Sequence, residues 1–285
     1  MRVHDDELDI DEPLVRALLA EQFPEWANLP LARVEPEGTV NVIYRLGLDK
    51  SLRLPRVEWA ADEEHQREHL VLPVLATQLP VRIPAPIAQG RPGRGYPWSW
   101  WVFDWIDGDL PTAPIDAVEV AAFVAALQRV DTSAAPEPSG NRDKPLAFRD
   151  RWVREALERV DAPGAVELWE RAMKAPPWSE PRVWIHADLD RRNVLVREGK
   201  LVAVLDWGGA GLGDPAIDVM AAWKLVSRDE REVFRSLLSV DDDTWLRAQG
   251  WVVSQALIAL AYYTPENNPA IHAEATRWLA EVLPS

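Results

Sequence analysis

The 285-residue sequence contains no cysteine. This absence excludes a disulfide framework, a thiolate zinc site, an iron–sulfur cluster and a cysteine nucleophile. Basic residues are also scarce, because 31 Lys and Arg stand against 46 Asp and Glu and the formal net charge is −15. A charge of this sign repels nucleic acid and anionic membranes and attracts cationic small molecules. We therefore predict that the protein binds neither nucleic acid nor membrane.

Long hydrophobic runs and a phosphate-binding P-loop are missing as well. The most apolar late stretch, Trp251–Tyr263, is interrupted by Ser254 and Gln255 and is too short to span a bilayer. The acidic start MRVHDDELDIDEPL lacks the basic and apolar regions of a signal peptide. No GxxxxGK[ST] motif occurs, which excludes a P-loop. These features predict a cytoplasmic protein.

The pattern of apolar residues predicts two domains with different content, since about 150 residues per domain is usual. The first part is rich in strands, and Asp11 and Pro13 begin a short helix before them. Strands are expected at Thr39–Leu46, Ser51–Leu54 and Trp98–Ile106. One long helix is expected at Glu58–Leu79, where Pro80 ends it. The proline-rich segment Val81–Ile87 is expected to be an edge strand or a loop.

The second part is mainly helical. Helices are expected at Ala117–Val130 and at about 148–160, 163–174, 215–227, 229–239, 243–263 and 268–283, with a polar loop at Asp131–Pro145. Only Arg182–Asp206 interrupts them with strands. The sequence thus predicts an α+β fold with a strand-rich domain at 1–105, a helical domain at 106–285, and a hinge near 104–112.

A short β-hairpin is expected to bring oxygen ligands together. If Arg197 pairs with Lys200, Val196 faces Leu201 and Val194 faces Ala203. The open end then places Asn193 within a residue or two of Asp206. Amide and carboxylate oxygens are ligands that Mg²⁺ prefers, together with water and phosphate oxygens. Asp188 lies one tight loop earlier, where it can act on a substrate held beside the metal.

The order of these residues matches a kinase catalytic loop. The spacing His186-x-Asp188-x-x-x-x-Asn193 has that form, with Ala187 where protein kinases have Arg. Asp206-Trp207-Gly208 stands where the metal-binding Asp-Phe-Gly is expected. In such an arrangement Asp188 acts as a base or orients the substrate, and Asn193 and Asp206 hold Mg²⁺.

The stretch IHADLDRRNVLV…LVAVLDWGGAGLGDPAID resembles the signature of the aminoglycoside phosphotransferase family, which includes macrolide phosphotransferases. The resemblance implies a bilobal protein-kinase-like fold, with an antiparallel sheet and one long helix in a small N-terminal lobe. It also implies transfer of the γ-phosphate of ATP or GTP to a hydroxyl group of a small molecule. Under this resemblance His186 and Asp218 support the catalytic loop.

The sequence departs from the family's usual pattern at two places. Ala187 replaces the loop glycine, and Asp190-Arg191-Arg192 replaces His-Pro-Gly. Family members usually offer a lysine to the nucleotide phosphates from the strand before the long helix. In this chain the corresponding strand at 51–54 directs Leu52 and Leu54 to one side and Arg53 to the other. Arg53 is therefore the preferred phosphate contact, and Lys50 is the alternative. Its partner on the long helix is expected to be Glu68, with Glu64 as second choice.

The remaining nucleotide contacts are less distinctive in sequence. The loop Glu37–Asn41 suggests a contact by Thr39 or Asn41. In WVFDWI, the purine edge is expected to meet backbone groups of Asp104 and Ile106, and Phe103 to line the back of the pocket.

The acceptor stays open at this point. Acidic side chains that could face it are Asp190, Asp241–Asp243 and Glu266. The net charge favours a cationic acceptor such as an aminoglycoside, and the resemblance also admits macrolides and metabolites of choline or homoserine type. A catalytically degenerate nucleotide-binding homologue is a further alternative.

One motif points to another class of enzyme. His65-Gln66-Arg67-Glu68-His69 fits H-x-x-E-H, in which two histidines one helical turn apart chelate zinc and the glutamate acts as base. The four tryptophans Trp98, Trp100, Trp101 and Trp105 are interpreted as packing residues rather than as an aromatic cage for a cation.

Overall fold

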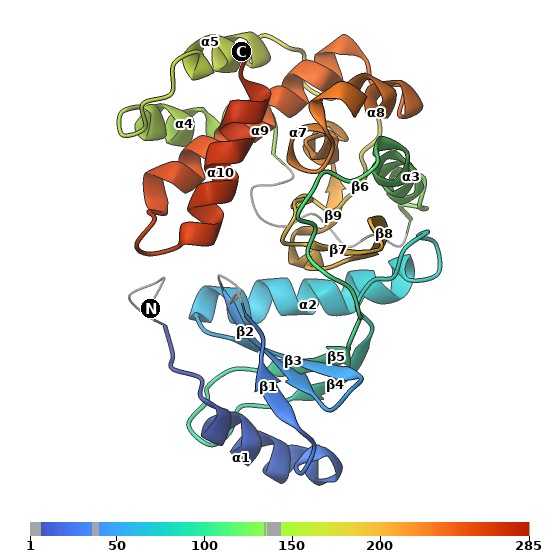
Figure 1. Ribbon diagram of the computed structural model, residues 1–285, viewed down its shortest axis with the longest axis vertical. Coiled ribbons are helices and arrows are strands. Elements are labelled where there is room, and N and C mark those ends of the chain that lie inside the picture. Colours follow the sequence, from blue (N-terminus) through green and yellow to red (C-terminus); the bar gives the residue numbers. More distant parts are fainter. Residues whose placement is uncertain (1–6, 36–39, 134, 136–143, 285) are drawn as a thin grey trace. The chain divides into compact units, whose positions relative to one another are not determined.

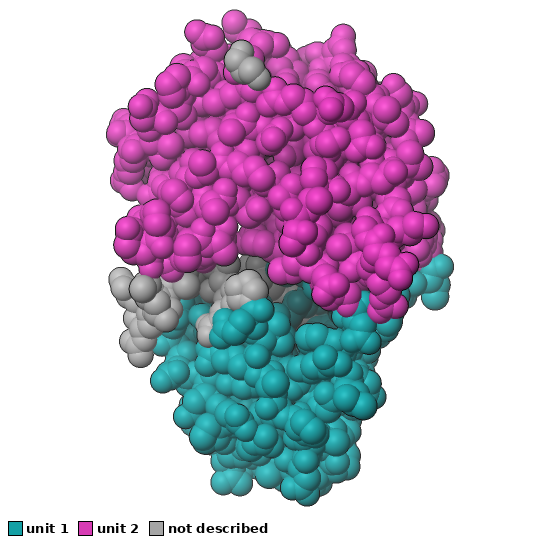
Figure 2. All heavy atoms as spheres, viewed as in Figure 1, with its two compact units in different colours: residues 1–77, 82–107, 205–208 teal, residues 78–81, 108–204, 209–285 magenta. Residues whose placement is uncertain are grey.

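A computed structural model describes residues 7–35, 40–133, 135 and 144–284, apart from the side chains of 59, 60 and 62–67. The chain forms two compact units, coloured separately in Figure 2. Unit 1 comprises Met1–Thr77, Arg82–Asp107 and Leu205–Gly208, and unit 2 comprises Gln78–Val81, Gly108–Val204 and Gly209–Ser285. Each unit is described by itself.

Unit 1 contains an antiparallel sheet of five strands in the order β1-β2-β3-β5-β4. The strands are β1 (Leu31–Arg33), β2 (Asn41–Leu46), β3 (Lys50–Pro55), β4 (Pro86–Gly90) and β5 (Trp100–Asp104). The edge strand β4 overlaps the predicted proline-rich segment Val81–Ile87 only at its end, because β4 begins five residues later and ends three residues later than that segment. An edge strand tolerates proline because one side of it needs no ladder hydrogen bonds.

Two helices cover the two faces of this sheet (Figure 1). On one face, α1 (Glu12–Gln22) buries Leu18 and Leu19 against a core that includes Leu52, Leu54 and other strand residues. On the other face lies α2 (Glu58–Leu75), which contacts β3 and β5. Alternation along β3 therefore sends the leucines to α1 and the residue between them, Arg53, to α2.

The predicted end of the long helix at Leu79 is wrong by four residues, because α2 ends at Leu75. Pro73 lies inside the last turn, where it has no amide hydrogen to donate to the preceding turn. The final helical bond is donated by the Ala76 amide to the Leu72 carbonyl.

Unit 2 is mainly helical, with two small antiparallel sheets. Its helices are α3 (Ala117–Gln128), α4 (Asp150–Leu157), α5 (Ala165–Ala172), α6 (Ala216–Val219), α7 (Ala221–Lys224), α8 (Arg231–Leu237), α9 (Asp242–Tyr262) and α10 (Pro269–Val282). The single helix predicted at 215–227 is two short helices that meet at Met220. The helix α9 packs against α4, α5, α6 and α10, so it forms the centre of this unit.

The two small sheets flank the segment that carries the kinase-like motif. They pair β6 (Val183–Ile185) with β9 (Gly211–Gly213), and β7 (Val194–Arg197) with β8 (Lys200–Val204). The sequence did not predict β9, since glycine is disfavoured in strands. The glycine at 213 is explained by the close approach of β6 to β9, because a Cβ atom at Gly213 would lie 2.4 Å from Ile185 Cδ1.

Most of the tryptophans serve packing. Eight of the fifteen are buried, namely Trp100, Trp101, Trp169, Trp184, Trp207, Trp223, Trp251 and Trp278. Among the described residues, no helix is both long and apolar enough to cross a membrane.

We expect the Asp241→Ala variant to lose about 1 kcal/mol of stability at neutral pH, because Asp241 caps the central helix α9. Its carboxylate accepts a hydrogen bond from the Thr244 amide at 2.6 Å, and that bond lowers the pKa of Asp241. A lowered folded-state pKa means that the stabilisation is present above the unfolded pKa and is lost as the pH falls through the folded one. Urea unfolding between pH 7 and pH 3 tests this: the difference between wild type and variant should shrink toward low pH, and a constant difference would contradict it.

Candidate active site

The hairpin at 194–204 forms, with one change of register. Arg197 pairs with Lys200 and Val196 with Leu201, as predicted, but Leu195 pairs with Ala203 and Val194 with Val204. The predicted Val194–Ala203 pair is therefore wrong by one residue. Val202 is the extra residue of a β-bulge, and the consecutive residues Ala203 and Val204 after it are both buried. Asn193 directly precedes the last pair, and Asp206 follows it by two residues.

The catalytic-loop segment is anchored by a buried carboxylate. Asp218 in α6 has no exposed surface and accepts hydrogen bonds from the His186 amide at 2.7 Å and the Ala187 amide at 2.9 Å. Burial raises the pKa of Asp218, while the nearby His186 and Lys224 oppose this rise. The imidazole of His186 accepts from the Asp188 amide at 3.2 Å, so both residues shape the start of the loop.

Ala187 adopts a left-handed backbone conformation, with φ +70°. A side chain in this conformation costs about 1–2 kcal/mol relative to the right-handed one. The strain gives a physical reason for a glycine at this position, and the loop keeps its turn in spite of the alanine.

We expect the Ala187→Gly variant to differ from wild type by less than about 1 kcal/mol in stability. Relief of the left-handed strain is opposed by the greater flexibility of glycine in the unfolded chain. Ala187→Val should instead be strongly destabilised, because a branched side chain fits this conformation poorly and the site is fully buried. Thermal unfolding of both variants tests this, and equal losses would contradict the assignment of strain.

Asp188 and Asn193 contact each other within the loop. Asn193 Nδ2 donates to the Asp188 backbone oxygen at 2.9 Å and to its carboxylate Oδ2 at 3.1 Å. Because the amide nitrogen is used in these bonds, the side chain presents its oxygen, Oδ1, as a ligand atom. A hard amide oxygen next to a carboxylate fits Mg²⁺ in chemical type.

Asp206 belongs to unit 1, where it lies near Arg53. Its backbone is left-handed, with φ +60°, and its side chain is 44% exposed. The carboxylate Oδ1 is 4.0 Å from Arg53 Nη1. An accessible carboxylate on a sharply turned backbone is suited to a divalent cation, so Asp206 also fits a magnesium ligand.

Arg53 and Glu68 form a buried ion pair in unit 1. Arg53 Nη1 lies 2.5 Å from Glu68 Oε2, and the two side chains are 13% and 2% exposed. Glu68 Oε1 also accepts from the Trp207 amide at 2.8 Å, which links α2 to the residue after Asp206. Burial raises the pKa of Glu68, and the charge of Arg53 opposes the rise. Sequence reasoning did not foresee the Trp207 bond, since no sequence pattern marks a backbone donor.

The alternative residues for this pair are placed differently. Lys50 Nζ is 2.9 Å from the neighbouring Asp49 carboxylate. The side chain of Glu64 lies outside the described residues. Arg53 and Glu68 are thus in contact with each other, and the choice of Arg53 over Lys50 as the phosphate contact stays a prediction.

The strand β5 and the residues after it hold the predicted purine contacts. The Asp104 amide donates to the Ala85 carbonyl at 3.0 Å, and the Asp104 carboxylate accepts from the Ala85 amide at 2.6 Å. Phe103 is buried, and its ring centre lies 5.4 Å from the Arg53 guanidinium carbon. Ile106 is also buried, and Thr39 lies outside the described residues.

The acidic candidates for acceptor binding fall into two groups. Asp190 is fully buried and accepts from the Arg192 amide at 2.8 Å and from Arg192 Nη2 at 2.5 Å, so its carboxylate holds the loop together. We therefore assign it a structural role in place of the expected substrate contact. Glu266 is exposed, and a hydrogen bond with Thr264 lowers its pKa. Of Asp241–Asp243, the first caps α9 and the second pairs with Arg235.

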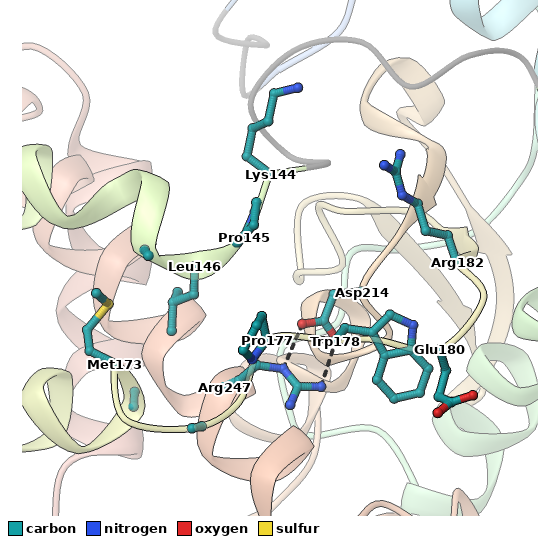
Figure 3. A pocket seen from close by; sticks show the side chains of 13 residues that line it. Lys144, Pro145, Leu146, Met173, Pro177, Trp178, Glu180, Arg182, Asp214 and Arg247 are labelled. Carbon is teal, nitrogen blue, oxygen red and sulfur yellow. Dashed lines mark hydrogen bonds and ion pairs between the residues drawn. The ribbon is translucent and has the colours of Figure 1, made fainter.

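A pocket of about 370 Å³ lies elsewhere in unit 2 and includes none of the predicted site residues. Figure 3 shows Trp178 beside the Arg247–Asp214 pair, whose closest atoms, Arg247 Nε and Asp214 Oδ2, are 2.7 Å apart. Arg247 Nη1 also donates to the Pro176 carbonyl at 3.0 Å, which ties the loop before β6 to α9.

The zinc motif on α2 is not assembled as a site in the described part of the chain. Glu68 is bonded to Arg53, and His69 is exposed and stacks against Trp101 with ring centres 4.7 Å apart. The side chain of His65 is outside the described residues. Among the described residues, no group of three or more His, Cys, Asp or Glu side chains could hold a metal ion.

The five-stranded antiparallel sheet, the long helix and the helical remainder define the α+β fold of kinase-like phosphotransferases. The chain belongs to the phosphotransferase enzyme family, whose model matches residues 32–251. This confirms the family resemblance and the fold class that the sequence predicted.

Solved structures of antibiotic kinases share the fold. A GDP complex of an aminoglycoside 2'-phosphotransferase-IIIa variant has a TM-score of 0.73 at 18% identity, covering 95% of this chain and 97% of the other. Macrolide 2'-phosphotransferase type I has a TM-score of 0.68 at 18% identity, with coverages of 98% and 99%. Macrolide 2'-phosphotransferase MphH from Brachybacterium faecium has a TM-score of 0.60 at 24% identity, with coverages of 91% and 97%. The comparison with curated proteins gave no match.

Proposed function

We propose that this protein transfers the γ-phosphoryl group of ATP or GTP to a hydroxyl group of a small molecule, with Mg²⁺ as cofactor. The observation that carries the proposal is the Asp188–Asn193 contact at 3.1 Å, in a loop held by the buried Asp218. Membership of the phosphotransferase enzyme family supports the reaction class.

Asp188 orients the acceptor hydroxyl and receives its proton. The acceptor oxygen forms a bond to the γ-phosphorus, and the bond from that phosphorus to the bridging oxygen of the nucleotide breaks. Asn193 and Asp206 would hold Mg²⁺, which neutralises charge on the phosphates when bound. Arg53, fixed by Glu68, supplies a further positive charge to them. Most of the rate enhancement then comes from positioning and electrostatic stabilisation.

Nucleotide binding is assigned to unit 1. Because the Asp104 amide is used in the sheet, its carbonyl oxygen and the Ile106 amide are the backbone groups proposed for the purine edge. Phe103 would lie against the base, near Arg53. Thr39 remains a predicted contact.

The proposal for the acceptor molecule rests on the similar structures and on the charge of the chain. Antibiotic acceptors are favoured by the aminoglycoside and macrolide phosphotransferases among the similar structures, and would make this a resistance enzyme. The net charge of −15 suits a cationic aminoglycoside, for which Glu266 is an exposed candidate contact. A kinase of a small metabolite is the second candidate, and the arginines of the catalytic loop, Arg191 and Arg192, favour an acceptor that carries negative charge.

Thermal unfolding with Mg·ATP, with Mg·GTP, and with each nucleotide plus EDTA tests the nucleotide site. A nucleotide at about 100 times its dissociation constant adds roughly 2.7 kcal/mol of stability. For a chain of this size, we expect a rise in Tm of several degrees that EDTA abolishes. A folded protein that shows no rise with either nucleotide would contradict the proposal.

A further inference from the structure

Positive charge gathers around the catalytic loop in spite of the acidic balance of the chain. We use the name α10 cation cluster for the basic residues on α10 or near it, which are Arg191, Arg192, Lys224, Arg228, Arg231 and, on the helix itself, Arg277. Arg192 and Lys224 lie over the Trp278 ring, at 5.8 and 4.0 Å from its centre. The catalytic loop and α10 are thus joined through basic side chains that pack on one tryptophan.

Most members of the cluster have acceptors in the protein. Arg192 bonds to Asp190, and Arg231 bonds to Glu281. Arg277 Nη2 bonds to Glu274 at 2.5 Å and to the Lys224 carbonyl at 2.8 Å. These contacts hold α10 and the loop in place without needing a ligand.

Arg191 differs from the other members. Its Nε atom is buried and has no hydrogen-bond partner among the described residues. The guanidinium is half-buried and faces Arg277, with Glu274 and Glu281 as the nearby carboxylates. Burial and the charge of Arg277 lower the pKa of Arg191. Glu274 is paired with Arg277, and Glu281 with Arg228 and Arg231, so two carboxylates face four guanidinium groups here. An additional anion would balance this excess of positive charge.

The position of Arg191 in the chain connects it to the reaction. It follows Asp188 by three residues and precedes Asn193 by two, within the loop that Asp218 anchors. An anion held by this guanidinium would therefore be bound to the same loop that carries Asp188. Guanidinium groups bind carboxylates and phosphates through paired, charge-assisted hydrogen bonds.

We propose that Arg191 binds an anionic group of the acceptor, so that the acceptor is a small hydroxyl compound that carries a carboxylate or a phosphate monoester. This inference rests on the proposed phosphotransferase function and names the substrate class of the same site. The inference favours a metabolite acceptor over a cationic aminoglycoside. The nearby charge of Arg191 acts on a bound molecule more strongly than the net negative charge of the chain, which is distant and screened by salt.

Anion binding tests this inference without requiring the right acceptor. Thermal unfolding is measured in saturating Mg·ADP, with glycerate, glycerol 3-phosphate or the neutral control glycerol added. We expect one of the two anions to raise Tm in wild type and in Arg159→Gln, which removes an exposed arginine elsewhere in unit 2. Arg191→Gln should abolish the rise. The anion that acts distinguishes a carboxylate from a phosphate group.

Steady-state transfer to the same three compounds gives a second readout. Arg191→Gln should lower kcat/KM for the preferred anionic acceptor about 10- to 100-fold, as expected for charge-assisted hydrogen bonds. The KM for the nucleotide should stay within about twofold, and Arg191→Lys should retain part of the activity.

Three results would overturn the inference. The first is that neither anion raises Tm, or that the rise is unchanged in Arg191→Gln. The second is that Arg191→Gln raises the KM for the nucleotide more than it affects the acceptor, and the third is that wild type and Arg191→Gln phosphorylate kanamycin equally. The first of these leaves the proposed function intact if Mg·ATP or Mg·GTP still raises Tm. Failure of both nucleotides to raise Tm rejects the proposed function itself, while the anion-binding comparison still reports on Arg191.

Discussion

The Asp188→Ala variant is expected to lose about 10²- to 10⁴-fold in kcat for phosphoryl transfer, the usual contribution of a positioned general base. The carboxylate of Asp188 is held by Asn193 Nδ2 at 3.1 Å, so removing it takes away both the proton acceptor and the orientation of the hydroxyl. Steady-state kinetics with detection of the phosphorylated product measures the loss.

Asp188→Asn provides the matched control, since it keeps the size of the side chain and removes its charge. We expect a loss of similar size, with the nucleotide-induced rise in Tm retained in both variants. If the kcat of Asp188→Asn equalled that of the wild type, the assignment of Asp188 as the base would be wrong.

The Glu68→Ala variant is expected to lose about 3–5 kcal/mol of stability, because it removes the buried carboxylate that pairs with the charge of Arg53. Arg53 is only 13% exposed, and the Trp207 amide loses its acceptor in the same variant. Urea unfolding measures the loss, and a cost below about 1 kcal/mol would contradict a buried ion pair.

The double variant Arg53→Met, Glu68→Gln separates packing from nucleotide binding. A neutral pair of similar volume should recover much of the stability, since buried ion pairs are often replaceable by uncharged groups. The metal-dependent rise in Tm with nucleotide should nevertheless be lost, because no cation remains at residue 53. A full rise in the double variant would show that another residue, such as Lys50, contacts the phosphates.

The sequence predicted the Arg53–Glu68 contact because it depends on two periodicities. Alternation along the strand placed Arg53 opposite to Leu52 and Leu54, and both leucines are fully buried on the other face. The helical position of Glu68 then provided the partner, at 2.5 Å. Such contacts follow from local geometry and from which face is apolar.

The register of the hairpin could not be predicted in full. Residues 201–204 are all apolar, so alternation does not show which of them is the extra residue. The bulge at Val202 depends on packing and on pairing with a further segment, since the amide and carbonyl of Val196 bond to Asp109. A contact between residues so distant in the sequence leaves no local pattern.

The net charge and the acidic residues of the sequence were the least reliable guide to the chemical class of the acceptor. Asp190 was a candidate substrate contact by residue type, but its carboxylate is buried against Arg192. The basic residues around α10 come from four separate segments of the sequence, so the net charge of −15 concealed their proximity. Only the fold brings them together.

The most direct test of the account is transfer itself, followed by ³¹P NMR with Mg·ATP or Mg·GTP and a panel of neutral, anionic and cationic hydroxyl compounds. We expect a new phosphomonoester signal from at least one acceptor, matched by the nucleoside diphosphate formed, and lost in Asp188→Ala. A protein that binds Mg·nucleotide but transfers no more phosphate to any acceptor than Asp188→Ala does would contradict it and identify a nucleotide-binding homologue without turnover.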